Sequence, residues 1–182
     1  MAENGKEEKK TRTILLSGDV DEAMAKKAVE KLTELALQDP VKDITVLIDT
    51  WGGYIADMFT IHDIMRAIPC DIRTVGLGRV VSAGVLLLAA GTKGKRFVAP
   101  NCTVMEHQIS TGAWGDPEDL EIEARRVRKL QDRVFALLAK YTGQKKLQLD
   151  KDFRKEKYMD AKEAVDYGLA DSILKEGKLW KG

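Results

Sequence analysis

The order of short apolar segments along the chain constrains the fold more than any other feature. Three such segments lie in the first half of the sequence: R-T-I-L-L-S at Arg12–Ser17, I-T-V-L-I at Ile44–Ile48 and D-I-R-T-V at Asp71–Val75. The middle segment is almost entirely apolar, which is typical of a strand covered on both faces of a parallel sheet. Segments with helical spacing separate the three. This alternation predicts an α/β fold with a largely parallel sheet.

The helices between these strands are defined by their ends. Either Asp19 or Asp21 is suited to cap the first helix, and Pro40 ends it. Pro69 closes the second helix. The apolar positions expected on one face are Met24, Ala28, Leu32 and Leu35 in the first helix and Ile61, Ile64, Met65 and Ile68 in the second.

The second half of the chain combines short patterns with one long helix. The short patterns predict helices at Ala83–Ala90 and at Ala161–Tyr167, the latter capped by Gly168, and strands at Lys95–Ala99, Thr103–Glu106 and Asp171–Leu174.

The long helix is expected at Glu118–Tyr141, after Pro117 and with several acidic side chains in its first turn. Its apolar residues form only a narrow stripe: Leu120, Val127, Leu130, Val134, Leu137 and Leu138. Such a helix packs either on its own domain or against a second subunit. We favour the subunit, because a narrow stripe suits helix–helix packing.

The charge balance and the hydropathy argue against several classes of protein. Thirty basic and twenty-nine acidic side chains leave a formal net charge of +1, which gives no support to nucleic-acid binding. Residues Met1–Thr11 are polar, are expected to be disordered and lack the apolar core of a signal peptide. The longest apolar run, Val80–Ala90, is too short to span a bilayer. We therefore expect a cytoplasmic protein with no membrane partner.

The residue types that bind metals are scarce. Cys70 and Cys102 both lie in apolar surroundings, which favours two buried thiols over a disulfide or a metal site. The two histidines, His62 and His107, have no metal-ligand spacing to a cysteine. We expect no metal site and no cofactor. His62 lies in the middle of a predicted helix and is assigned no chemical role.

A single hydroxyl, Ser82, stands in the small-residue stretch G-R-V-V-S-A-G at Gly78–Gly84, just before the apolar helix. This position suits a nucleophile, because the side chain is accessible and backbone N–H groups lie nearby. It equally suits an ordinary serine that caps a buried helix. The pair Gly52-Gly53 also follows a predicted strand, so it is expected to share one crevice with Ser82.

Several motifs in the same order resemble the proteolytic subunit of the Clp proteases. They are I-D-T-W-G-G, G-R-V-V-S-A-G, A-A-G-T-K-G-K-R-F, V-M-E-H-Q and E-A-V-D-Y-G-L-A-D-S-I-L. The resemblance extends from about Arg12 to Leu174. It implies the fold shared by these peptidases and the crotonases, a repeated β-β-α superhelix with a protruding handle helix. It also implies a single domain over residues 12–182, with a head at 12–105 and 150–175 and a handle at about 106–149.

The resemblance implies a serine peptidase and assigns roles to individual residues. Ser82 takes the place of the nucleophile and His107 that of the general base. The backbone N–H groups of Gly53 and Ala83 take the place of the oxyanion hole. The third member of the triad falls at Glu156, where the family has an aspartate. Glu also serves in some Ser-His triads, and the nearby alternatives are Asp152 and Asp160.

The segment 108–115 corresponds to the strand on which the family lays an extended peptide. Two residues beside this path depart from the family pattern, since Trp51 and Ile109 both replace prolines. The residues expected to contact substrate are Trp51, Gly52, Gln108, Ile109 and Ser110.

The resemblance implies an endopeptidase whose seven-membered rings stack in pairs, through the long helix, around the active sites. The family partner is a hexameric AAA+ ATPase unfoldase, which binds axial loops formed by an apolar and aromatic N-terminal segment. Residues before Arg12 are charged and contain no aromatic side chain, which argues against this partner. Two other interpretations stay open: a catalytically impaired ClpP-like structural or regulatory subunit, and an acyl-CoA enzyme of the related crotonase fold.

Overall fold

The computed structural model describes residues 11–179, which form one seven-stranded sheet and six helices. The strands are β1 (Thr13–Val20), β2 (Ile44–Gly53), β3 (Ile72–Val81), β4 (Arg96–Val98), β5 (Thr103–Glu106), β6 (Lys157–Met159) and β7 (Ser172–Ile173). The helices are α1 (Glu22–Gln38), α2 (Ile55–Ala67), α3 (Ala83–Ala89), α4 (Pro117–Thr142), α5 (Lys146–Asp152) and α6 (Ala161–Tyr167). The predicted disorder of Met1–Thr11 falls, apart from Thr11, outside the described residues.

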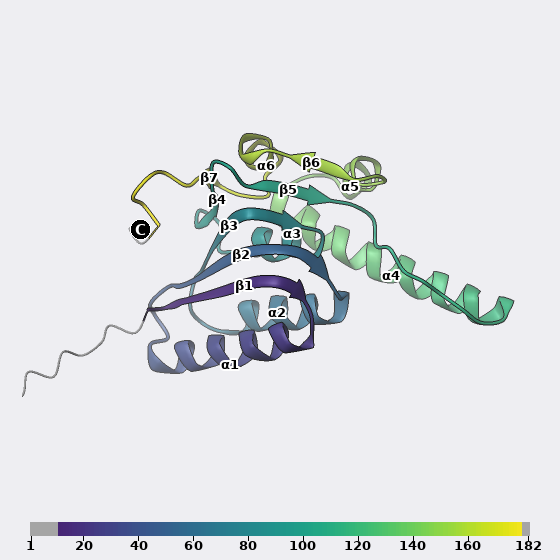
Figure 1. The fold of residues 1–182 in the computed structure, drawn as a ribbon, viewed down its shortest axis with the longest axis horizontal. Helices are drawn as coiled ribbons and strands as arrows, with labels where there is room; N and C mark the ends of the chain where they lie inside the picture. Colours follow the sequence, from purple (N-terminus) through teal and green to yellow (C-terminus); the bar gives the residue numbers. More distant parts are fainter. Residues whose placement is uncertain (1–10, 180–182) are drawn as a thin grey trace, which may run out of the picture.

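The sheet is parallel along its main path, β1-β2-β3-β4-β7. Strand β5 joins β3 in parallel and then pairs with β6, the one antiparallel pair among residues 11–179. Helices α1, α2 and α3 cover one face of the strands (Figure 1). The predicted α/β fold with a parallel sheet is therefore confirmed.

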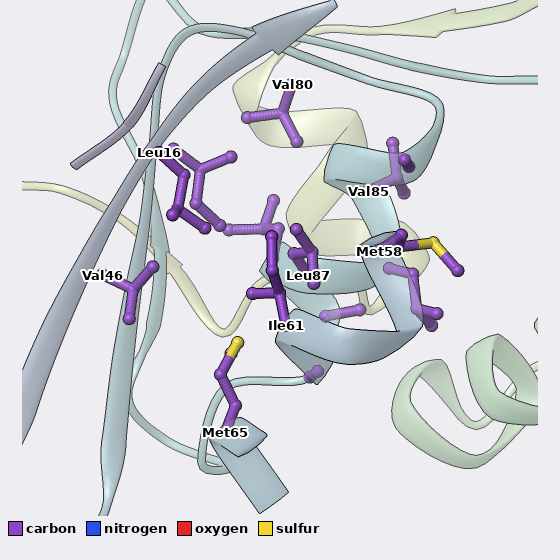
Figure 2. Packing of buried hydrophobic residues seen from close by; sticks show 14 of the residues in the cluster. Leu16, Val46, Met58, Ile61, Met65, Val80, Val85 and Leu87 are labelled. Atoms are coloured by element: carbon purple, nitrogen blue, oxygen red, sulfur yellow. The ribbon is translucent and has the colours of Figure 1, made fainter. Parts of the chain in front are cut away.

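The core lies between this sheet face and its helices. Alternate residues of β2 are buried, as expected when one face of a strand points into a core. Figure 2 shows how the strand side chains Leu16, Val46 and Val80 lie toward the helix side chains, among them Ile61 and Leu87. Full burial of each such side chain contributes about 1.5–3 kcal/mol. This packing fixes the junction between β3 and α3, where Ser82 lies.

Three strands run further than the sequence predicts. The segments predicted to end at Ser17, Ile48 and Val75 continue to Val20 in β1, to Gly53 in β2 and to Val81 in β3. The β2–β3 pairing shifts register between Ile48 and Thr50, so the strands continue past the irregularity instead of ending there. The backbone at Gly78 has a φ of 48°. The added length carries β2 and β3 to the candidate site.

Helix α4 is confirmed together with its ends. The Asp116 side chain caps it, Pro117 starts it, and Gly143 ends it in the left-handed conformation. Its buried residues, Val134, Phe135 and Leu138, all lie in the C-terminal half. The N-terminal half projects away from the sheet (Figure 1), and Ile122 on it is 57% exposed. This half is not laid on the chain's own domain, so packing against a second subunit stays the prediction for it.

The C-terminal segment contains two elements that the sequence analysis did not predict, α5 and β6. Helix α6 is confirmed, with a capping box between Asp160 and Glu163 and Gly168 as its C-cap. Asp21, one of the two expected caps of α1, accepts the backbone N–H of Met24.

Candidate active site

Ser82 has a backbone conformation that its surroundings must impose. Its φ is 52° and its ψ is −117°, and among residues 11–179 it is the one non-glycine residue with positive φ. A non-glycine residue in a sparsely populated region costs about 1–3 kcal/mol and is typical of functional sites. The Ser82 N–H donates to the Met105 carbonyl at 2.8 Å, and the Ser82 carbonyl accepts from Val85 at 2.8 Å. These bonds hold the strained residue between β5 and α3.

The interpretation of Ser82 as an ordinary capping serine does not fit this geometry. Ser82 occupies the N-cap position of α3, but its side chain makes no capping hydrogen bond. The hydroxyl is thus not committed to the helix, although the residue stands at its N-terminus.

Gly52 and Gly53 bring the main chain of β2 against the serine. A Cβ at Gly52, where φ is 94°, would lie 2.8 Å from the Ser82 Cβ and 3.2 Å from the Ala83 nitrogen. At Gly53, where φ is 153°, a Cβ would overlap the Val20 backbone. Both positions require glycine, because a side chain at Gly52 would force β2 away from the β3–α3 junction and one at Gly53 would force it away from β1.

A cavity of about 240 Å³ opens beside Ser82. Seven of the residues singled out from the sequence line it: Trp51, Gly53, Ser82, Ala83, His107, Ile109 and Ser110. The other two, Gly52 and Gln108, do not line the cavity. Gly52 packs against the Cβ of Ser82. Ser82 and His107, which are distant in sequence, are thus brought to one cavity by the parallel pairing of β3 with β5.

The backbone of Glu156 lies near this site, but its side chain does not contact the site residues. Lys157 pairs with Glu106, which places Glu156 near the strand end that leads into His107. Its side chain is exposed, and its Oε2 accepts a hydrogen bond from the Tyr158 hydroxyl at 3.1 Å. This bond raises the pKa of Tyr158. Glu156 does not line the cavity.

The two alternative acids are engaged elsewhere. Asp160 caps α6 by accepting the backbone N–H of Glu163 at 2.8 Å. Asp152 accepts from Gln148 at 2.7 Å and from the Tyr167 hydroxyl at 2.8 Å, and hydrogen bonding, first of all from Gln148, lowers its pKa. Neither residue is on the cavity wall.

Two polar residues of the cavity were missed by the sequence analysis. Glu106 is only 4% exposed, and burial raises its pKa to about 8, against the opposing effect of the His107 N–H that it accepts at 3.0 Å. Gln131 accepts the Ile109 N–H at 2.6 Å through Oε1, while its Nε2 is buried and has no hydrogen-bond partner. The sequence does contain a signal for the burial of Glu106. This acid lies two residues after Val104 in an apolar strand, so both side chains are on one face of the strand.

Trp51 lies at the rim, 62% exposed. The Arg79 guanidinium lies over its ring, 4.3 Å from the centroid, and the Arg79 Nε is 3.4 Å from the Asp49 carboxylate. These contacts fix the indole beside the cavity, where a substrate side chain can contact it.

The remaining cysteine and histidine side chains are buried away from the cavity. Cys70 and Cys102 are free and buried, as predicted, and burial raises the pKa of the Cys102 thiol to about 12. His62 is buried and bonded to the Tyr141 hydroxyl at 2.7 Å and to Asp63 at 2.8 Å. Across residues 11–179, no three His, Cys, Asp or Glu side chains form a group that could hold a metal ion. No helix in that range is long and apolar enough to cross a membrane.

The site thus consists of a strained serine at a strand-to-helix junction, two glycines of β2 packed near it and a histidine in the same cavity. A serine on a strained strand-to-helix junction is one of the features from which a catalytic site is recognised. A comparison with models of protein families agrees: the model of the Clp protease family matches residues 6–177. The chain therefore belongs to the Clp protease family, a family of peptidases. This match gives no support to the alternative of an acyl-CoA enzyme.

Proposed function

We propose that the protein is a serine endopeptidase that cleaves peptides and unfolded proteins. The observation that carries this proposal is the strained Ser82, which shares a cavity with His107. Strain of this kind is retained where it positions a reacting group. Family membership supports the peptidase class.

The proposed reaction follows from the order of these groups. The Ser82 Oγ attacks the carbonyl carbon of the peptide bond while His107 takes the hydroxyl proton. The backbone N–H groups of Gly53 and Ala83 stabilise the oxyanion. His107 then gives the proton to the leaving amine, which breaks the C–N bond and leaves an acyl-enzyme on Ser82. Water, deprotonated by His107, releases the second product and restores the serine.

Peptide binding is proposed for the segment 108–115. The segment follows His107 and belongs to no helix or strand, so its backbone groups suit pairing with an extended substrate. The Ile109 N–H is already used by Gln131. Trp51, Gly52, Gln108 and Ser110 complete the proposed substrate contacts.

Assembly is the second part of the proposal. Family members generally form oligomeric rings. The projecting half of α4 exposes Leu120 and Ile122, and Trp114 just before it is 94% exposed. These exposed side chains support a subunit contact at this half of α4. The resemblance to the family extends the proposal to stacked heptameric rings, a tetradecamer with the active sites inside and α4 as the handle of the single domain. The residues that bear on an AAA+ ATPase partner lie outside the described range.

The position of Glu156 favours a second candidate, a catalytically impaired subunit with a structural or regulatory role. In the structure described above, the Glu156 carboxylate contacts Tyr158 at the surface. For the endopeptidase, Glu156 must turn from Tyr158 to orient His107. The two candidates therefore differ in whether this carboxylate supports catalysis.

Hydrolysis of fluorogenic peptides by the purified oligomer tests the proposal, with Ser82→Ala as the matched variant. We expect turnover by the wild-type protein and none by the variant at the same oligomeric state. Equal activity of the two proteins would overturn the assignment of Ser82. An intact oligomer with no turnover of any peptide would favour the impaired subunit.

A further inference from the structure

The cavity beside Ser82 has apolar walls and a buried carboxyl group. Ile55, Met58, Leu86 and Val134 supply the apolar surface, and Glu106 is the one acidic side chain on the wall. An engineered cavity of about 150 Å³ holds a benzene molecule. The volume of about 240 Å³ here is thus sufficient for one long side chain.

Glu106 is buried at the end of β5, and its carboxyl is not neutralised by an ion pair. Its carboxyl accepts the backbone N–H of His107 at 3.0 Å, and no cation pairs with it among the ion pairs of residues 11–179. A buried carboxyl without a cation is costly, and an apolar residue at this position would pack without that cost. Its presence on the wall of the reaction cavity indicates a ligand that supplies the missing partner.

We propose that Glu106 makes the peptidase selective for substrates with lysine or arginine immediately before the cleaved bond. This inference rests on the proposed function, because Ser82 must be the nucleophile for the cavity to receive that side chain. The aliphatic stem of lysine or arginine matches the four apolar wall residues. Its cationic end then meets the Glu106 carboxylate in a desolvated site, where a charge-assisted hydrogen bond is strong.

Gln131 supports the same assignment. Its Oε1 accepts the Ile109 N–H, which fixes the amide of this cavity-wall residue, and its Nε2 is a buried donor without a hydrogen-bond partner. The Nε2 is available to an acceptor that approaches Gln131, either a substrate carbonyl oxygen or the Glu106 carboxylate. An ionised Glu106 with a cation in the cavity therefore leaves fewer buried polar groups unpaired than an empty cavity does.

The ionisation of Glu106 predicts that the selectivity depends on pH. In the empty cavity burial raises the pKa of Glu106 to about 8, so the carboxyl is mostly protonated at neutral pH. A bound cation favours the carboxylate, and its binding releases a proton to solvent. The titratable neighbours of Glu106 are His107 beside it, Lys157 opposite it in β6 and Tyr167 of α6. None of them forms an ion pair with Glu106, so the preference for a basic side chain increases with the ionisation of Glu106 as pH rises from 6 to 9.

The test uses a pair of peptidyl diphenyl phosphonates that differ in one residue, lysine or norleucine, before the phosphonate. Norleucine keeps the aliphatic stem and lacks the charge. The readout is the rate at which each probe modifies Ser82, measured by mass spectrometry on the assembled protein. We expect the lysine probe to react roughly tenfold faster or more, the size of one charge-assisted contact, with the ratio rising between pH 6 and pH 9.

The ratio of the lysine-probe rate to the norleucine-probe rate, rather than either absolute rate, identifies the role of Glu106. In Glu106→Gln the ratio is expected to fall close to one and to lose its pH dependence. The matched control, Glu30→Gln on the exposed face of α1, keeps the wild-type ratio. The inference is overturned if the norleucine probe reacts as fast as the lysine probe. It is also overturned if a small fluorophosphonate labels Ser82 but neither peptide probe does. Failure of all three reagents overturns the proposed function itself.

Discussion

The two sides of the candidate active site differ in how firmly the fold holds them. On the nucleophile side, Ser82 is bonded to Met105, and Gly52 packs directly against it. On the acid side, Glu156 is exposed on the loop before a three-residue strand, and its partner is Tyr158. The position of the nucleophile is therefore set by the core of the domain, whereas the acid depends on the orientation of an exposed side chain.

The largest effect is expected on the nucleophile side. Ser82→Ala removes the attacking oxygen, and His107→Ala removes the base, so each is expected to lower kcat/KM by roughly 10⁴-fold or more. The double variant is expected to be no worse than either single variant, because the two residues act as a unit. Peptide hydrolysis by all three proteins measures this. Additive losses would contradict the shared mechanism.

The acid side gives the sharpest test of the comparison. Glu156→Gln is expected to lower kcat/KM by about 10²- to 10⁴-fold if the carboxylate orients His107. Glu156→Asp, which keeps the charge, is expected to retain most of the activity, and Tyr158→Phe, which releases the carboxylate from its surface contact, is expected to raise it. Steady-state kinetics of the three variants decide the matter. Activity unchanged in Glu156→Gln would mean that Glu156 is not the third member of the triad.

A smaller but diagnostic loss is expected when Gly52, which packs against Ser82, is altered. Gly52→Ala places a Cβ 2.8 Å from the Ser82 Cβ, so the serine or strand β2 must shift. We expect a fall in kcat of about 10²-fold, comparable to the loss of one oxyanion donor, with a lower Tm. Gly94→Ala, where φ is also positive but no atom lies near the added Cβ, is the control for backbone strain alone. An equal loss of activity in both variants would contradict the role of the close approach.

The stability of the protein is expected to depend on pH through Glu106. Its pKa is raised in the folded state to about 8, so between its ordinary value and 8 the folded protein binds more protons than the unfolded chain. Stability therefore falls as pH rises from about 5 to 8. Since one pKa unit corresponds to about 1.4 kcal/mol, we expect Glu106→Gln to gain about 2 kcal/mol or more relative to wild type across this range. Denaturant unfolding at pH 5 and pH 8 measures the difference. Parallel pH profiles of the two proteins would contradict it.

The sequence predicted the fold where local patterns and tertiary structure agree. The capped helix α6 and the strand β5 lie where their patterns place them. The continuation of β2 and β3 through glycines was not predictable, because pairing with neighbouring strands keeps the backbone extended there. Strand β6 was missed for the same reason, since three residues become a strand only by pairing with β5.

The candidate site was predictable in its residue types but not in its conformation. The strain at Ser82 comes from the packing of β3, β5 and α3, and no local propensity favours a positive φ at a serine. The burial of Glu106 depends on which face of β5 the domain covers. The contact of Glu156 with Tyr158 depends on a rotamer that a sequence does not specify.

The central claim, that His107 activates Ser82 for attack, is tested most directly by labelling with a fluorophosphonate and mapping the adduct by mass spectrometry. We expect a single adduct on Ser82 in the wild-type oligomer, none in Ser82→Ala, and labelling slowed by at least about 10²-fold in His107→Ala, the lower limit for loss of a general base. An unlabelled Ser82 in the intact wild-type oligomer, or labelling that is equally fast without His107, would contradict the account.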